Sequence, residues 1–242
     1  MMEKRNQEEE KIRDPEKITL LRRVSGRFPP YVWITFILVL SLQMLVFYGT
    51  RIPLSSLTLH DLDTSLDAMI PFLPEWVVIY FWSYLSWVVG VILVVAESKE
   101  HGYRFAAAYV LALLISCAAF LIWPATMTRP EVTGEGFFRD WMRFLYRVDT
   151  PTNLCPSLHV WISYLCFRGT MGCRTIPRWY KIYRFVFLVL VCFSVLFVKQ
   201  HVLIDIPAAL VTGEVSMQLS SAFRMERVLY GLEKILKKRK RS

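Results

Sequence analysis

The sequence predicts an all-α, polytopic membrane protein in which six transmembrane helices form one bundle. Of its 242 residues, 55% are hydrophobic, and the mean hydropathy of +0.38 is too high for an ordinary soluble domain. Six apolar runs approach the roughly 20 residues that cross a hydrocarbon core about 30 Å thick. Six packed helices leave no room for a separate soluble domain, so we expect a single membrane domain.

The six predicted spans divide the chain into a membrane domain with two flanking tails. The spans cover residues 31–48, 76–95, 105–123, 156–170, 183–198 and 202–223. A charged N-terminal tail (1–30) precedes the membrane domain (31–223), and a basic C-terminal tail (224–242) follows it. The N-terminal tail lacks a small-residue cleavage site, so we expect a solvated cytoplasmic segment rather than a signal peptide.

The distribution of charge orients the bundle. The net charge of +9 is compatible with nucleic-acid binding, but the basic residues gather in both tails and in the loop 168–184. Six spans place these three segments on one side, as the positive-inside rule requires of the cytoplasm. The loop between the first two spans is acidic, with Arg51 opposing Asp61, Asp63, Asp67 and Glu75. We therefore expect membrane lipids as partners, no nucleic acid, and both termini in the cytoplasm.

The long external connection between the third and fourth spans contains a predicted amphipathic helix at 137–147. Phe137, Trp141, Phe144 and Leu145 share one face of this helix, and its charged residues lie mostly elsewhere. Such a helix can lie in the membrane interface with its apolar side toward the lipid. Packing over the end of the bundle explains the pattern equally well. Either arrangement places the helix beside the two histidine motifs described next.

Two histidines occupy constrained positions at the predicted outer ends of spans. His159 lies in the first turn of the fourth span, and His201 lies between the fifth and sixth spans. Asp205 follows His201 by four residues, which places the carboxylate one helical turn beyond the imidazole on the same face. The alternating connectivity brings both motifs and Arg129 to the same side of the membrane.

This combination of residues predicts phosphoryl transfer. A neutral His201 can attack phosphorus to form a phosphohistidine, while Asp205 fixes its tautomer by accepting the proton of the other ring nitrogen. His159 can protonate the leaving alkoxide and later activate a water or alcohol. The alternative interpretation is that these histidines are satisfied polar groups at helix ends.

Four further residues are candidates for phosphate binding. Arg129 and Lys199 supply positive charge, although each also suits an ordinary interfacial cation. Pro156 suits a first helical position, where free amides and the Ser157 hydroxyl would form an anion site. Asn153 can cap the fourth span or donate to the phosphate, and we favour capping.

The motifs resemble those of the type 2 phosphatidic acid phosphatase (PAP2) superfamily of membrane lipid phosphatases and phosphotransferases. Roughly residues 105–223 carry the resemblance, as Arg129-Pro130, Pro156-Ser157-Leu158-His159 and His201-Val202-Leu203-Ile204-Asp205. The resemblance implies a six-helix bundle and a lipid phosphate substrate. It implies His201 as nucleophile, His159 as acid and base, Asp205 as the partner of the nucleophile, and no metal or cofactor.

The chain departs from the usual family pattern at three positions. Ile122 replaces a lysine, Val195 replaces an arginine, and Leu158 replaces the glycine between serine and histidine. Two phosphate-binding cations of the common pattern are thus missing, and Lys199 is the nearest substitute. The motifs are similar to those of inositol phosphorylceramide synthase-like transferases and many bacterial PAP2-like proteins.

Three functions are compatible with these residues. The first is an extracytoplasmic lipid phosphatase that hydrolyses a phosphomonoester or pyrophosphate. The second is a phosphotransferase that passes a phospho-headgroup to a lipid alcohol through the same histidine. The third is a non-catalytic transporter or lipid-binding membrane protein. We favour the first.

Overall fold

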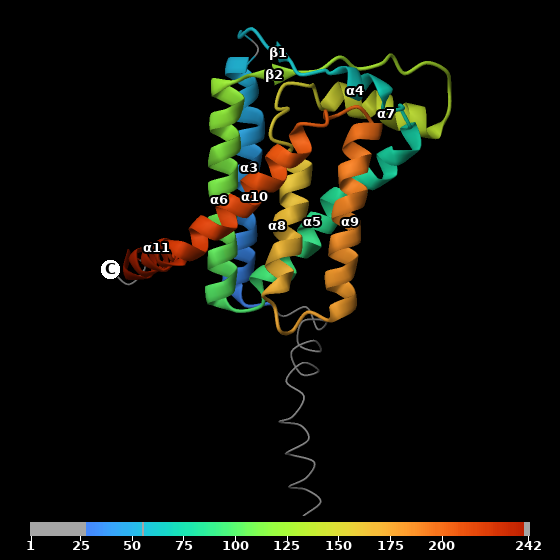
Figure 1. The fold of residues 1–242 in the computed structure, drawn as a ribbon. Coiled ribbons are helices and arrows are strands. Elements are labelled where there is room, and N and C mark those ends of the chain that lie inside the picture. The colour runs from blue at the N-terminus through green and yellow to red at the C-terminus, as the bar shows by residue number, and fades with distance from the viewer. Residues whose placement is uncertain (1–27, 55, 240–242) are drawn as a thin grey trace, which may run out of the picture.

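The computed structural model describes residues 28–54 and 56–239, which fold almost entirely into helices (Figure 1). Most of the predicted N-terminal tail (1–27) and the last three residues of the chain lie outside the described residues. Helices occur at all six predicted span positions. They are α3 (Pro30–Leu54), α5 (Val77–Val95), α6 (Lys99–Ile122), α8 (Leu158–Met171), α9 (Arg178–Phe197) and α10 (Asp205–Ala222).

Four helical segments in the described part of the chain are long and apolar enough to cross a membrane. They are α3, the segment Pro74–Val95 that contains α5, α6 and α9. α8 has only 14 residues, and α10 begins with Asp205 and contains Glu214. The four apolar helices indicate a membrane protein.

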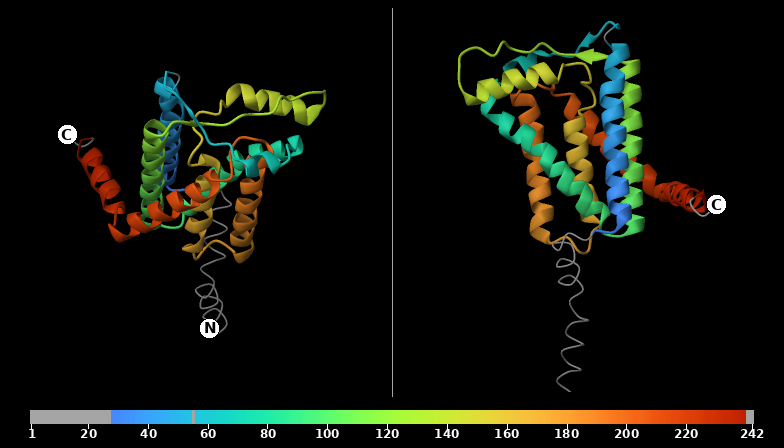
Figure 2. Two further views of the ribbon diagram at one scale, coloured as in Figure 1. Left: turned by 45° about the horizontal axis from the view of Figure 1, so that its top comes forward. Right: turned by 180° about the vertical axis from the view of Figure 1, so that it is seen from behind.

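α8 is the central helix of the bundle. It packs against α5, α6, α9 and α10, and Figures 1 and 2 show it surrounded by these helices. Trp161, Ile162 and Leu165 are fully buried on it. Since a helix buried on most sides contacts protein rather than lipid, α8 does not show the long apolar run of a lipid-facing span. This explains why the fourth predicted span is the shortest.

Short elements cover one end of the bundle, which we call the outer end (Figure 1). They are β1 (His60–Asp61), α4 (Ser65–Met69), the 3₁₀ helix η1 (Pro74–Trp76), β2 (Ala125–Thr126) and α7 (Phe137–Val148). β1 and β2 form a two-stranded parallel sheet in which His60 pairs with Ala125. α8 and α10 both begin at this end, so the segments that carry the two histidine motifs meet there.

The predicted amphipathic helix in the outer loop forms as α7 and lies across the outer end of α5 (Figure 2). Met142 and Leu145 are buried against the bundle, whereas Phe137 and Phe144 are 66% and 46% exposed. The four residues predicted to share one apolar face are thus divided between the bundle and the surface. Packing on the bundle accounts for part of the apolar pattern.

The predicted C-terminal tail contains a helix, α11 (Glu226–Arg239), which packs against the first turns of α6. Lys99 Nζ lies 2.5 Å from Glu233 Oε2, and the rings of Tyr103 and Tyr230 meet edge to face. The basic end of the chain is therefore anchored at the end of α6 opposite to the outer loops.

A buried arginine crosses the interface between α5 and α9. Arg184 is 1% exposed, and its Nη1 donates to the carbonyl and the hydroxyl of Ser86 at 3.0 and 2.5 Å. Gly90 provides the space for this guanidinium, because a Cβ atom there would lie 2.9 Å from Arg184 Nη2 and 3.0 Å from Cys166 Sγ. An additional methyl group at this point would force the buried guanidinium of Arg184 to shift.

We predict that Gly90→Ala destabilises the protein by about 1–3 kcal/mol, the usual cost of overpacking a core. Its melting temperature in detergent should fall. Gly49→Ala is a matched control, because a Cβ atom on this other helical glycine would have no neighbour within 4 Å. That substitution should leave the melting temperature unchanged or raise it slightly, since alanine favours helix. Equal effects of both substitutions would contradict the packing described for Gly90.

Candidate active site

The loop between α9 and α10 presents the first histidine. The amides of Gln200 and His201 both donate to the carbonyl of Val195, at 3.0 and 3.1 Å. Lys199 has a φ of 51°, in the left-handed region that non-glycine residues rarely adopt. These features reverse the chain sharply at the end of α9 and direct the His201 side chain into the outer end of the bundle.

His201 and Asp205 form the pair that their spacing predicted. His201 Nδ1 lies 2.9 Å from Asp205 Oδ2, which also accepts from the amide of Val202 at 3.1 Å. Both side chains are buried, Asp205 completely. In the neutral ring, the carboxylate favours a proton on Nδ1 and leaves the lone pair on Nε2. Nε2 is therefore the atom that can act as a nucleophile.

His159 lies across from His201 at the start of α8. The two ring centroids are 6.2 Å apart. The ring of His159 stacks on Tyr80 at 4.1 Å and also meets Trp87 and Tyr84 at 4.8 and 5.3 Å. Within the described residues, His159 Nε2 is buried and has no hydrogen-bond partner. His159 also lines a small cavity together with His201.

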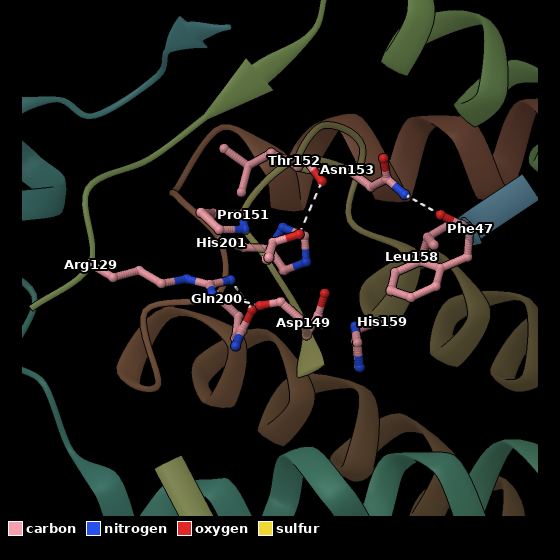
Figure 3. Close-up of a pocket in the computed structure, with 12 residues that line it drawn as sticks. Phe47, Arg129, Asp149, Pro151, Thr152, Asn153, Leu158, His159, Gln200 and His201 are labelled. Atoms are coloured by element: carbon pink, nitrogen blue, oxygen red, sulfur yellow. Dashed lines mark hydrogen bonds between the residues drawn. The ribbon is translucent and has the colours of Figure 1, made fainter. Parts of the chain in front are cut away.

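Arg129 borders the same site from the loop after α6 (Figure 3). Its Nη1 donates to the carbonyl of Asp149 at 2.6 Å, its Nη2 donates to Gln200 Oε1, and its guanidinium lies over the ring of Tyr146. Burial lowers the pKa of Arg129, while the nearby charge of Asp149 opposes this effect. Three contacts thus hold the guanidinium plane beside His201.

Two cavities meet at His201 and Arg129. The smaller is about 20 Å³, enough for about one water molecule, and is also lined by His159, Asn153 and Gln200 (Figure 3). The larger is about 520 Å³ and is also lined by Asp63, Asp67, Thr128 and Lys199. The candidate nucleophile therefore faces a tight space beside His159 and a wider space beneath the outer loops.

One sequence interpretation at the start of α8 needs correction, and another stays a prediction. The N-cap of α8 is Ser157, whose Oγ accepts from the amide of Val160, so Pro156 lies before the helix and not at its first position. Ser157 is fully buried and is not among the residues that line either of these two cavities. Its predicted role in phosphate binding therefore has no geometric support.

The capping role favoured for Asn153 is also wrong. Asn153 Nδ2 donates to the carbonyl of Phe47 at 2.8 Å, and its Oδ1 accepts from Thr50 at 3.2 Å. Both partners belong to α3. The side chain ties the loop before α8 to α3, and the residue lines the smaller cavity.

Lys199 faces the larger cavity. Its Nζ donates to the carbonyl of Asp67 at 2.8 Å. Burial lowers the pKa of Lys199, and the charges of Asp67 and Asp63 partly oppose this effect. The ammonium group is thus near His201 but is held on the side of α4, away from His159.

Three residues outside the predicted set support the site. Asp149 Oδ1 accepts from Arg51 at 2.6 Å, and its Oδ2 accepts from the hydroxyl of Tyr80 at 2.9 Å. Tyr80 in turn stacks on His159. In the sequence, Arg51 stands out as the basic residue that opposes the acidic residues of the predicted first external loop. Nothing in the pattern of the second span distinguished Tyr80 from its aromatic neighbours.

Asp67 connects α4 to the loop that carries His201. Its Oδ1 accepts from the amide of Leu203 at 2.7 Å, and its Oδ2 accepts from the amide of Thr64 at 3.0 Å as part of a capping box. Asp67 is 5% exposed. The loop that contains α4 therefore holds the backbone of the loop that carries His201.

The chain matches no protein-family model, and neither a curated protein nor a solved structure matches it significantly. The resemblance to the PAP2 superfamily stays a prediction from the motifs. Among the described residues, no group of three or more His, Cys, Asp or Glu side chains is arranged to hold a metal ion.

We predict that Lys199 makes phosphate binding sensitive to alkaline pH. As pH rises through its lowered pKa, the ammonium group loses its charge, and affinity for an anion in the larger cavity should fall. Lys199→Arg should move this fall to higher pH, because a guanidinium stays protonated. The affinity for inorganic phosphate, measured by calorimetry from neutral to strongly alkaline pH, tests this. Lys181→Arg, at the other end of the bundle, is the control, and an unshifted profile for Lys199→Arg would contradict the prediction.

Proposed function

We propose that the protein is a membrane-bound lipid phosphate phosphatase that works through a phosphohistidine at His201. The observation that carries this proposal is the pairing of two imidazoles across one small cavity. One imidazole is held by a buried carboxylate, the other has a buried nitrogen with no hydrogen-bond partner in the described part of the chain, and Arg129 lines the same cavity. Histidines that only form hydrogen bonds at helix ends would not need a second histidine and an arginine at the same cavity.

The geometry supports a two-step reaction. In the first step, His201 Nε2 attacks phosphorus, a P–N bond forms, and the P–O bond to the lipid alcohol breaks. A protonated His159 gives its proton to the leaving alkoxide. In the second step, water gives a proton to His159 and attacks phosphorus, and the P–N bond breaks to release phosphate. Asp205 stabilises the positive charge that develops on His201.

Arg129 is the best-placed cation for the phosphoryl oxygens. It contacts Gln200, the residue next to the nucleophile, and it borders both cavities. A guanidinium matches two phosphate oxygens at once, whereas an ammonium acts as a point charge. In this proposal, Arg129 is the arginine of the Arg-Pro element, and Lys199 is the nearest substitute for the two cations that Ile122 and Val195 remove from the usual pattern.

The proposed membrane arrangement has six spans, with α8 and α10 completing the bundle of the four apolar helices. The acidic outer loops and the site then lie outside the cytoplasm, and both termini lie inside, as the positive-inside rule requires. The exposed rings of Phe137, Trp141 and Phe144 support a position of α7 in the outer interface, where aromatic side chains are favoured.

The larger cavity favours phosphotransfer as a second candidate function. Its volume of about 520 Å³ falls within the ~300–1,000 Å³ of typical ligand pockets. A phosphoryl group alone needs little of this space. A headgroup that stays attached to phosphorus during transfer to a lipid alcohol would use it. Assays with and without lipid alcohols separate the two functions, because hydrolysis releases free phosphate and transfer produces a new phosphodiester.

We predict that His201→Ala abolishes phosphate release from a lipid phosphate and that His159→Ala lowers it by about 10²–10⁴-fold, the usual contribution of a general acid. Turnover should persist with a chelator present. The measurement is phosphate release by purified protein in detergent. His60→Ala is the matched control, because His60 lies at the same end of the protein but stacks on Trp123, away from the site. If His201→Ala and His159→Ala both retained activity, the enzyme assignment would be abandoned.

A further inference from the structure

The position of His159 limits where the lipid part of the substrate can lie, if the proposed function is correct. His159 must protonate the oxygen that joins phosphorus to the hydrocarbon chain. The chain therefore begins within hydrogen-bond reach of His159 and leaves on the side of the ring away from His201. Three aromatic rings surround His159, namely those of Tyr80, Tyr84 and Trp87.

Of these three rings, only Tyr84 reaches the surface. Tyr80 is 1% exposed and donates to Asp149, and Trp87 is 6% exposed and donates to Ser163. Tyr84 is 40% exposed, although its ring lies 5.3 Å from the ring of His159. The side chain of Tyr84 therefore lies between His159, the candidate acid, and the surface of the bundle.

The surface around Tyr84 is apolar and belongs to a helix that is long and apolar enough to cross the membrane. On α5, Leu85 and Val88 are 51% and 36% exposed. Toward the outer end, Phe81 contacts Tyr84 and also the rings of Trp141 and Phe144 on α7. A continuous apolar surface thus extends from Tyr84 in both directions along α5.

The arrangement of α3 and α5 exposes this surface. Figure 2 (right) shows α5 running obliquely across α8, with its outer half turned away from α3. The smaller cavity reaches the same side, because Phe47 of α3 lines it together with His159 and His201. The smaller cavity therefore lies on the side where the outer halves of α3 and α5 diverge.

We propose that the hydrocarbon chain of the lipid substrate reaches the site between α3 and α5, with Tyr84 as the gate, and lies against the apolar face of α5. The occupant is a single hydrocarbon chain, because the contact surface consists of aromatic and aliphatic side chains on a helix that faces lipid. Tyr84 moves aside to admit the ester oxygen and then separates His159 from the membrane again.

Enlarging the gate residue tests this proposal. Tyr84→Trp should lower the ratio of kcat/KM for a long-chain lipid phosphate to kcat/KM for water-soluble para-nitrophenyl phosphate by about tenfold, since pocket contacts of this size discriminate to that extent. Tyr84→Phe should keep the wild-type ratio. Leu114→Trp, at a position that is 59% exposed on α6, is the matched control and should change neither constant. An unchanged ratio in Tyr84→Trp would overturn the proposal.

Photo-crosslinking gives a readout that does not depend on activity. A lipid phosphate with a diazirine in its chain is bound to the His201→Ala protein, and the labelled residues are identified by mass spectrometry. Labelling concentrated at 81–88 supports the chain site, and labelling spread over all lipid-facing helices overturns it. If wild-type protein shows no turnover but labels at 81–88, the phosphatase proposal fails and the chain site stands. If turnover depends on His201 but labelling is spread, only the chain site fails.

Discussion

One oxygen atom of Asp205 organises the candidate site. It accepts hydrogen bonds from the imidazole of His201 and from the amide of Val202, and the carboxylate has no exposed surface. Asp205 is also the first residue of α10, where the helix dipole favours negative charge. A buried carboxylate without these partners would be costly. The same carboxylate therefore starts α10 and sets the orientation of His201.

The outer loops hold the two histidines in place through backbone hydrogen bonds, side-chain hydrogen bonds and an aromatic contact. Asp67 binds the backbone of Leu203 on one side of the loop, and Arg129 binds the side chain of Gln200 on the other. Asp149 links Arg51 and Tyr80, and Tyr80 stacks on His159. Each histidine is thus supported by a residue from an outer loop as well as by its own part of the chain. Rigid support of this kind is what the proposed phosphoryl transfer would need, because reacting groups must keep their geometry.

The sequence predicted those parts of the site that depend on local spacing or on topology. His201 and Asp205 meet because they are one helical turn apart. His159 meets them because alternating helices return the chain to the same end. The contacts of Asn153 and Lys199 depend instead on tertiary packing, since their partners lie on α3 and α4, more than 100 residues away along the chain. No periodicity in the sequence encodes such contacts.

The same distinction applies to the fold. The six helices and α7 follow from apolar runs and helical periodicity, and helices occur at these positions. Four of the six predicted spans are long and apolar enough to cross a membrane in the described part of the chain. The central location of α8 was not, because a short buried helix and a weak span have the same composition. Arg184 and Gly90 likewise reveal their relationship only in three dimensions, where a missing side chain on one helix accommodates a guanidinium from another.

The most direct test is to determine which atom carries phosphate during turnover. His159→Ala protein, in which breakdown of the intermediate is slowed, is mixed with a lipid phosphate, quenched in alkali and analysed by mass spectrometry, with ³¹P NMR to identify the ring nitrogen. We expect one phosphoryl group on His201, attached through Nε2. A phosphoryl group on another residue, or turnover by wild-type protein through direct attack of water with no phosphohistidine at any time, would contradict His201 as the nucleophile.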